Sequence, residues 1–333
     1  MEDDADGSRC AGTVAPMPHP LLPLPAPIAD RVFSLAEARD LGVQPERLRR
    51  RDVRRIGPGL YAPAGAVPSE LAIAAALQHD RPDAVVSRLS AARIWELPLP
   101  RSVLQKQDAP VDLTLPPGSR RLRRAGTRAR FARLPPTSIT TVGPVRITTR
   151  VQTWRDLAGA DAHLSDLALT QIGDHLVRSP RPWAENGRTD PWATLEGLAH
   201  LVASSRGRPG AVRAARVLDQ VRVGADSPRE TELRLRLLAA GIPEPLLNVP
   251  VIGPHGRPMH EPDLQWPQWQ VAAEYEGADH RTAAQVRRDI DRAERLRRIG
   301  WTEIRLMNDH MHDRGREAVD RVRRALAERG WQP

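Results

Sequence analysis

The sequence predicts a multidomain α/β protein in which helices pack on mixed β-sheets, and three observations lead to this prediction. The chain has 333 residues, which is more than one ordinary hydrophobic core accommodates, so two or three domains are expected. Hydrophobic residues make up 40% of the chain, which is enough for globular domains. The last third alternates between helix-like and strand-like segments, an order typical of a mixed sheet with helices on its faces.

Residues 1–28 are rich in proline, alanine and acids and show no periodicity, so we expect a disordered tail. Residues 29–66 predict a winged helix-turn-helix domain. Ser34 and Glu37 form a capping box that begins a short helix, which ends at Gly42. A second helix is predicted from Pro45 to Asp52, and residues 53–62 predict a β-wing.

In a winged helix-turn-helix the second helix enters the major groove of DNA. Four arginines of this helix are therefore predicted to contact DNA phosphates or base edges: Arg47, Arg49, Arg50 and Arg51. Arg54 and Arg55 are predicted to contact the DNA backbone beside the wing. The alternative is that the arginine run is only a solvated helix face, as charge runs usually are.

Residues 67–158 predict an α+β domain without a catalytic constellation. Its expected helices and strands are 68–78, 84–95, 111–115, 127–131 and 145–149. The arginines of residues 120–124 either contact phosphates or lie on a solvated hairpin. Residues 159–224 predict a helical connector with helices over 161–178, 191–203 and 209–221.

Residues 225–333 contain the predicted catalytic and metal-binding residues. Ser227 caps a helix that ends at Gly241. After it the expected elements are a strand over 246–252, a strand at Asp263, a strand over 271–275, a helix over 282–299, a strand over 301–306 and a helix over 313–329.

Two neighbouring strands of this predicted sheet carry carboxylates. Asp263 lies on one apolar run, and Glu274 and Glu276 lie on the next. Adjacent strands that carry carboxylates at the same end form a site for a divalent cation such as Mg²⁺, which prefers oxygen ligands. His280 follows closely and could move the proton of an attacking water. Each acid alone would ordinarily be a solvated surface residue.

The motif Pro262-Asp263 followed by Glu274-Tyr275-Glu276 resembles the signature of restriction-endonuclease-like nucleases, and the C-terminal domain resembles the branch near the very-short-patch repair endonucleases. Further matching residues are Ser227-Pro-Arg-Glu230, His280, Arg288-Asp289, Arg292 and Gly300-Trp301. The segments Phe33–Val43, Gly59–Ala62 and Ser87–Ala92 resemble AbiEi-type antitoxins.

This resemblance implies residue roles. Asp263 and Glu274 would bind Mg²⁺, and Glu230 would reach the metal from the first helix. Glu276 would add a ligand or orient the nucleophile, and His280 would act as a base or contact phosphate. Arg288 and Arg292 would hold the DNA strand. Asp289 is expected to pair with an arginine instead.

One position departs from the nuclease signature. Glu276 stands where many relatives carry lysine, and the only lysine of the chain is Lys106. The repair-endonuclease branch also lacks that lysine and uses a histidine. His255 and His260 are expected to be exposed turn residues rather than ligands. Trp266 and Trp269 are expected to pack at the sheet edge, with stacking on DNA bases as the alternative.

The net charge of +9 favours a nucleic-acid partner, because phosphate contacts supply most non-specific affinity. No apolar run approaches the ~20 residues of a membrane span, and acids at the N-terminus argue against a signal peptide. Cys10 is the sole cysteine, which excludes a disulfide framework and a cysteine-based zinc site. We therefore expect a cytoplasmic protein outside the membrane.

Together these features predict a Mg²⁺-dependent DNA endonuclease that an N-terminal domain delivers to double-stranded DNA. The alternative is a non-catalytic, antitoxin-like regulator of transcription whose nuclease domain is vestigial. The antitoxin-like half also leaves a toxin partner open. A purely structural interaction protein fits less well, because the basic charge and the acid cluster both count against it.

Overall fold

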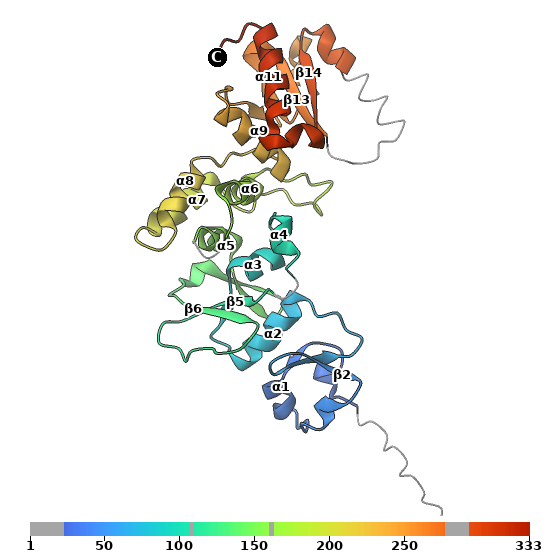
Figure 1. Cartoon of the computed structure of the whole chain (residues 1–333), viewed down its shortest axis with the longest axis vertical. Helices are drawn as coiled ribbons and strands as arrows, with labels where there is room; N and C mark the ends of the chain where they lie inside the picture. The colour runs from blue at the N-terminus through green and yellow to red at the C-terminus, as the bar shows by residue number, and fades with distance from the viewer. Residues whose placement is uncertain (1–22, 107–108, 160–162, 277–292) are drawn as a thin grey trace, which may run out of the picture.

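The structure is a computed structural model of the chain, and it describes residues 23–106, 109–159, 163–276 and 293–333. The molecule is elongated, and its parts follow one another along the long axis in chain order (Figure 1). Helices and mixed sheets alternate, which confirms the α/β class. None of the helices in the described ranges is long and apolar enough to cross a membrane.

The N-terminal unit is a small three-stranded antiparallel sheet with one α-helix. Its elements are β1 (Phe33–Ser34), α1 (Leu35–Asp40), η2 (Arg47–Arg49), β2 (Val53–Gly57) and β3 (Leu60–Pro63), with strand order β1-β3-β2. The hydroxyl of Ser34 accepts from the backbone nitrogen of Glu37, as the capping box predicts. The helix predicted from Pro45 to Asp52 is wrong in extent, because only a 3₁₀ turn forms before Arg50 becomes extended and leads into β2.

The middle domain is built on a five-stranded mixed sheet of order β6-β5-β4-β8-β7. Its strands are β4 (Val85–Val86), β5 (Val111–Leu115), β6 (Thr127–Phe131), β7 (Ile139–Val142) and β8 (Val145–Thr148), and its helices are α2 (Glu70–Asp80), α3 (Arg88–Ile94) and α4 (Arg101–Leu104). The single helix predicted over 84–95 is wrong at its start. Two buried β-branched residues, Val85 and Val86, form the central strand there instead.

The connector is helical and packs around a second core. It comprises α5 (Arg150–Leu157), α6 (Asp166–Val177), α7 (Leu195–Ser204) and α8 (Ala211–Leu218). Trp154 is fully buried in this core, and its indole nitrogen donates to the carbonyl of Leu169 at 2.9 Å. The guanidinium of Arg150 lies between the rings of Trp95 and Trp192, which ties the middle domain to the connector.

The C-terminal domain is a four-stranded mixed sheet of order β14-β13-β12-β9. Its elements are α9 (Pro228–Ala239), β9 (Leu246–Leu247), β10 (Val251–Ile252), β11 (Pro258–His260), β12 (Leu264–Trp266), β13 (Val271–Glu276), β14 (Thr302–Met307) and α11 (Arg316–Glu328). Residues 293–298 are also helical. The strand predicted over 246–252 is in fact two, because Asn248 adopts a left-handed backbone (φ 46°) between them.

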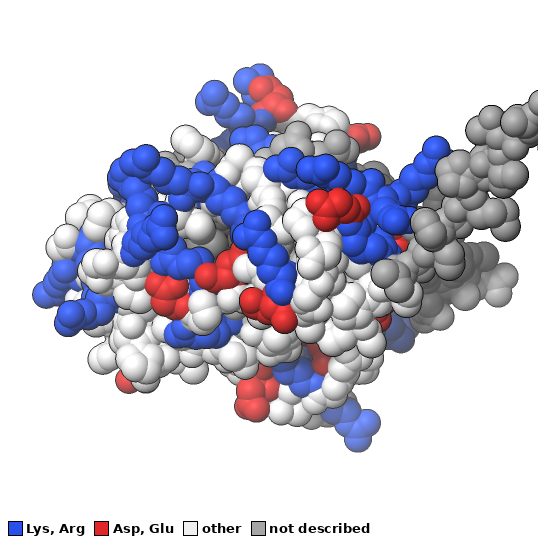
Figure 2. All heavy atoms as spheres, turned by 90° about the horizontal axis from the view of Figure 1, so that it is seen from below, with Lys and Arg blue, Asp and Glu red and all other residues white. Residues whose placement is uncertain are grey.

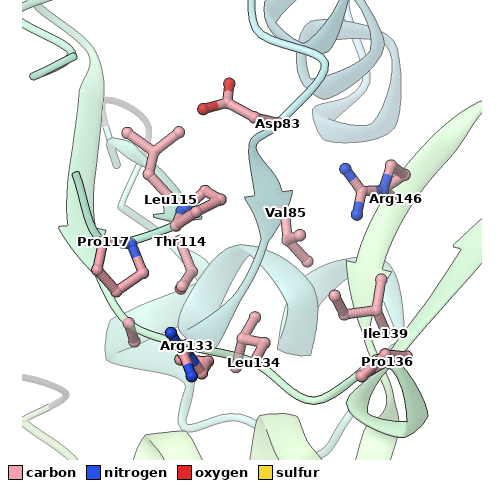
Figure 3. Close-up of a pocket in the computed structure, with 12 residues that line it drawn as sticks. Asp83, Val85, Thr114, Leu115, Pro117, Arg133, Leu134, Pro136, Ile139 and Arg146 are labelled. Carbon is pink, nitrogen blue, oxygen red and sulfur yellow. The ribbon is translucent and has the colours of Figure 1, made fainter. Parts of the chain in front are cut away.

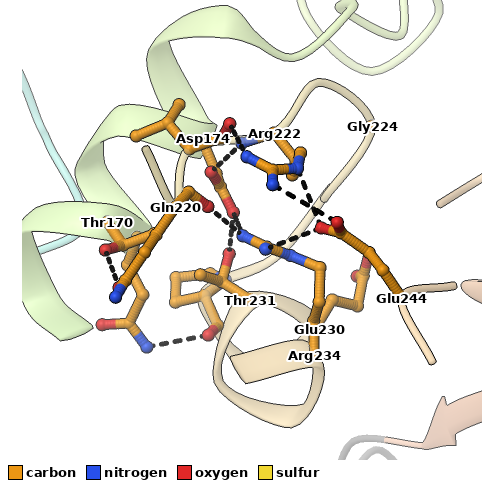
Figure 4. Close-up of polar contacts among 12 residues, drawn as sticks. Thr170, Asp174, Gln220, Arg222, Gly224, Glu230, Thr231, Arg234 and Glu244 are labelled. Carbon is orange, nitrogen blue, oxygen red and sulfur yellow. Dashed lines mark hydrogen bonds and ion pairs between the residues drawn. The ribbon is translucent and has the colours of Figure 1, made fainter. Parts of the chain in front are cut away.

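A buried ion pair joins the connector to the C-terminal domain (Figure 4). Asp174 on α6 and Arg234 on α9 lie 3.0 Å apart, with side chains 1% and 0% exposed. Asp174 also accepts from the hydroxyl of Thr231 at 2.8 Å and from the backbone nitrogen of Arg222 at 2.8 Å. Arg234 donates in turn to the carbonyl of Gln220 at 2.7 Å. Helix α9 is therefore anchored to the connector at Asp174 and at the carbonyl of Gln220.

Candidate functional site

The strand register brings Asp263 and Glu274 together. Leu264 of β12 faces Ala273 of β13 in an antiparallel pair, so one step along the register sets Asp263 opposite Glu274. The backbone nitrogen of Tyr275 donates to Oδ2 of Asp263 at 2.7 Å. Leu264 and Ala273 point into the core shared with α9 and α11, so Glu274, the next residue of β13, points to the opposite face of the sheet. Asp263 lies at the end of β12, one residue before the strand begins.

Glu230 reaches the same region from the first turn of α9. The hydroxyl of Ser227 caps this helix by accepting from the backbone nitrogen of Glu230 at 3.2 Å. The Oε2 atom of Glu230 accepts from the backbone nitrogen of Asp226 and from the side-chain amide of Asn248, both at 2.9 Å. The residue is 5% exposed, so these contacts hold its carboxyl group in place.

The shifted pKa values show that these carboxyl groups interact electrostatically. The pKa of Asp263 is raised to about 8, first by burial and then by the charges of Glu230 and Glu274. The pKa of Glu230 is raised as well, mainly by burial. Buried carboxylates repel one another unless a proton or a cation lies between them. The cluster is therefore chemically suited to bind a cation.

His260 is part of the cluster, although its position in the sequence predicts an exposed turn. That prediction is wrong: His260 lies on β11, its side chain is largely buried, and its Nε2 atom contacts Oε1 of Glu274. The hairpin β10–β11 brings the imidazole over the sheet, and no sequence motif marks this fold. His255 does lie exposed in the turn, with a left-handed backbone.

Glu276 lies farther along the same face of β13 and pairs with an arginine. Its Oε1 atom is 3.3 Å from Nη1 of Arg305 on β14, and Arg305 also contacts Glu303 at 3.3 Å. In the parallel pair β13–β14, Arg305 is the direct neighbour of Glu274. A guanidinium group thus lies close to the position at which related signatures carry lysine, and the sequence motif did not single out Arg305.

Three predicted site residues, His280, Arg288 and Arg292, lie outside the described residues. Within the described ranges, no group of three or more His, Cys, Asp or Glu side chains is placed to hold a metal ion. Mg²⁺ is commonly bound through one or two carboxylates, with waters and substrate phosphates completing its shell. Asp263 and Glu274 are carboxyl groups, the type of oxygen donor that this ion takes.

The predicted DNA contacts divide into two sets. Arg47 binds Asp52 through both guanidinium nitrogens, at 2.5 and 2.9 Å, and is mostly buried. Arg54 is exposed and donates to the carbonyl of Ala66 at 3.0 Å. The remaining arginines of the set are exposed: Arg49, Arg50 and Arg51. Figure 2, seen from the N-terminal end, shows that basic side chains are spread over this face among few acidic ones.

The tryptophans of the C-terminal domain are structural. Trp266 is fully buried, and its indole nitrogen donates to the carbonyl of Pro243 at 2.7 Å. Trp269 packs against the same core. Both tryptophans pack as predicted rather than lying free, but Trp266 is on the interior strand β12 and not at the sheet edge. It is too deeply buried to stack on a DNA base.

A cavity of about 550 Å³ lies elsewhere, on the sheet of the middle domain (Figure 3). Val85, Leu115 and Ile139 form part of its wall, and Asp83 and Arg146 lie at its rim. Asp83 is paired with Arg81, whose contacts lower the pKa of Asp83 to about 2. None of the C-terminal carboxylates lines this cavity, so it is separate from the acid cluster.

Comparison with known proteins identifies relatives but not an activity. No family model matches the chain. The uncharacterized proteins MT2308 and Rv2248 of Mycobacterium tuberculosis, from strains CDC 1551 and H37Rv, are each 35% identical to it over 130 residues. This match covers 39% of the chain and 48% of either relative, so the chain spans about half the length of the curated relatives it matches. No solved structure matches it.

Proposed function

We propose that the chain is a Mg²⁺-dependent endonuclease that cleaves double-stranded DNA. The observation that carries the proposal is the burial of Asp263 beside Glu230 and Glu274, which raises the pKa of Asp263 to about 8. Gathering like charges in this way costs folding free energy, and perturbed carboxyl groups of this kind concentrate at functional sites. The helix α9 before the sheet and the order β9-β12-β13-β14 support a restriction-endonuclease-like core.

Asp263 and Glu274 would hold the Mg²⁺ ion, with Glu230 within reach directly or through water. When bound, the ion supplies a water of lowered pKa and neutralises charge on the phosphate. The protein side chains orient this site. Tyr275 fixes Asp263 through its backbone nitrogen, and His260 holds Glu274 through Nε2. Arg305 offers a guanidinium beside Glu274 for the charge that develops on phosphate.

The N-terminal unit would deliver the nuclease to DNA as a winged helix-turn-helix. The hairpin β2–β3 supplies a wing, and the exposed residues Arg49, Arg50 and Arg51 precede it. The net charge of +9 supports a polyanionic partner. The short 3₁₀ turn at Arg47–Arg49 favours contacts with phosphate over deep insertion into the groove, because it is too short to fill the groove.

The decisive experiment is nicking of supercoiled plasmid by the full chain. We expect nicking with Mg²⁺, none in EDTA, and a loss of at least about a hundredfold in Asp263→Asn, as for other groups that stabilise a transition state. Asp320→Asn is the matched control, because Asp320 is an exposed acid of α11 whose partner is Arg323. Equal nicking by wild type and Asp263→Asn would exclude this site as the nuclease centre.

A second candidate function is a DNA-binding regulator without nuclease activity, as in antitoxin-like repressors. The observation that favours it is Glu276, which occupies the signature lysine position and is engaged by Arg305. This candidate predicts sequence-selective DNA binding that survives Asp263→Asn, and no cleavage of any DNA or RNA with Mg²⁺. It also leaves room for a toxin partner, which co-purification from the native host would reveal.

A further inference from the structure

A second cavity, of about 470 Å³, lies where the middle domain meets the connector. One wall is Thr114 of β5 with Arg130 and Phe131 of β6, and another is formed by Gln152, Arg155 and Asp156 of α5. Residues 132–134, which follow β6, separate this cavity from the cavity of Figure 3, since Arg133 and Leu134 line both. Arg208 and Pro209 close the remaining side.

Arg155 is the unusual residue of this cavity, because its charge is buried without an acidic hydrogen-bond partner among the residues that the structure describes. The side chain lines the cavity and the residue is 5% exposed. Its Nη1 atom donates to the carbonyl of Pro209 at 2.9 Å, whereas Nε and Nη2 have no hydrogen-bond partner among the described residues. A buried guanidinium with unused donors costs free energy unless a ligand completes its contacts.

The surrounding charges make the cavity basic. Burial lowers the pKa of Arg155, nearby Asp156 opposes that shift, and Arg208 and Arg130 lower the pKa further. Asp156 is the one carboxyl group among the lining residues, and it accepts from the amide of Gln152 at 2.8 Å. Burial raises the pKa of Asp156, so its negative charge is disfavoured there. The lining of the cavity thus contains one weak acid and four arginines: Arg130, Arg133, Arg155 and Arg208.

We infer that this cavity binds a phosphate group, carried by a phosphate monoester or present as free phosphate. The planar guanidinium of Arg155 has two adjacent buried donors without a hydrogen-bond partner among the described residues, Nε and Nη2, and this fork matches two phosphate oxygens. Arg208 precedes Pro209, lines the same cavity and is exposed, so it can meet the anion at the mouth. The volume exceeds that of phosphate alone, and Phe131 and Leu134 offer an apolar wall for the rest of a small organic ligand.

This inference is independent of the proposed nuclease activity, because none of the lining residues belongs to the C-terminal carboxylate cluster. The test is isothermal titration calorimetry of the full chain in EDTA. The probes are inorganic phosphate, adenosine monophosphate, and a single-stranded oligonucleotide with either a 5′-phosphate or a 5′-hydroxyl. Sodium chloride at equal ionic strength is the reference titrant, since it measures non-specific screening.

We expect saturable binding of phosphate or adenosine monophosphate, weakened at least about tenfold in Arg155→Gln and in Arg208→Gln. Arg208→Gln keeps the test valid if Arg155→Gln fails to fold, because Arg208 is exposed. Arg101→Gln, an exposed arginine of α4 outside the cavity, should bind as the wild type does. Preference for the 5′-phosphate oligonucleotide over its 5′-hydroxyl form would identify a nucleic-acid end as the source of the phosphate.

The inference is overturned by either of two results. One is the absence of saturable binding of every phosphate probe to the wild-type chain. The other is binding that Arg155→Gln and Arg208→Gln leave unchanged when both fold, because the phosphate would then occupy another surface.

Discussion

The carboxylate of Asp263 is fixed by the backbone of its neighbouring strand, since Oδ2 accepts from the nitrogen of Tyr275 at 2.7 Å. The bond holds Asp263 across the pair β12–β13, beside Glu274 and within the field of Glu230. The carboxyl group therefore cannot turn away from the charges that repel it. The folded sheet therefore holds Asp263 next to the like charges that raise its pKa.

Asp263→Asn should stabilise the metal-free protein. An amide oxygen can still accept from Tyr275, while the repulsion by Glu230 and Glu274 disappears. We expect a gain of about 1 kcal/mol in EDTA at pH 8, or about 2–4 °C in Tm. Thermal unfolding measures it, with Asp320→Asn as the control. A lower Tm for Asp263→Asn than for wild type would show that the carboxylate stabilises the fold.

His260 and His255 allow a matched test of whether the imidazole beside Glu274 contributes to metal binding and nicking. His260 contacts Glu274, whereas His255 is exposed in the preceding turn. His260→Gln should reduce Mg²⁺ affinity or nicking by about 10–100-fold, as loss of a residue that orients a metal ligand usually does. His255→Gln should change neither. Metal titration and plasmid nicking measure the effect, and equal losses in both variants would contradict the assignment.

Arg234→Met should destabilise the C-terminal half severely. It leaves Asp174 buried with its hydrogen bonds from Thr231 and Arg222 but without its countercharge. Breaking a buried pair in this way typically costs about 3–5 kcal/mol. Glu244→Gln weakens only more exposed ion pairs, with the same arginine and with Arg222, and should cost less than about 1 kcal/mol. Urea unfolding compares the two, and similar losses would refute the buried pair as an anchor.

The pH dependence of stability should include a contribution from His175 of α6. Burial, followed by the charges of Arg178 and Arg188, lowers its pKa to about 4. The unfolded chain binds a proton near pH 6.5 and the folded chain does not, so stability falls as the pH drops from about 6.5 to 4. His175→Gln should remove a loss on the order of 2 kcal/mol across that window. Urea unfolding at pH 7 and pH 4.5 tests it: an unchanged acid loss in the variant would assign the effect to other groups.

Substitutions of the arginines in the N-terminal unit should have two different effects, one on DNA binding and one on stability. Arg50→Ala and Arg51→Ala should weaken DNA binding, since each removes an exposed cation. Each should also reduce the salt slope, which is the slope of the logarithm of the binding constant against the logarithm of the salt concentration, by about one. Arg47→Ala should instead lower stability, because Arg47 is engaged by Asp52. Fluorescence anisotropy at several salt concentrations, together with thermal unfolding, distinguishes these effects. Salt slopes unchanged in Arg50→Ala and Arg51→Ala would place the DNA elsewhere.

Local signals in the sequence predict helix ends better than they predict short strands. The caps at Ser34 and Ser227 form as expected, because a capping residue and its partner are only three positions apart. The strand β4 contains only two residues, and its pairing partners β5 and β8 lie far along the chain. Pairing rather than propensity decides such strands, so no local pattern reveals them.

The candidate site was predictable where it follows strand alternation. Asp263 and Glu274 were placed on adjacent strands from their flanking apolar runs, and the register sets them side by side. His260 was missed because the hairpin β10–β11 folds it over the sheet. Arg305 was missed because it comes from a parallel strand whose neighbour is set by a crossover. Its contact with Glu276 has no signature in the sequence.

The packing of α9 on α6 has a practical consequence for anyone who wishes to dissect the molecule. A fragment that begins at residue 225 would lack Asp174 and the carbonyl of Gln220, and would leave Arg234 without these partners. A fragment that begins before Ser165, the residue that caps α6, would carry them along. The smallest transplantable module of the C-terminal half therefore includes helices of the connector, and a fusion made at the apparent linker would cut through the buried ion-pair interface between α6 and α9.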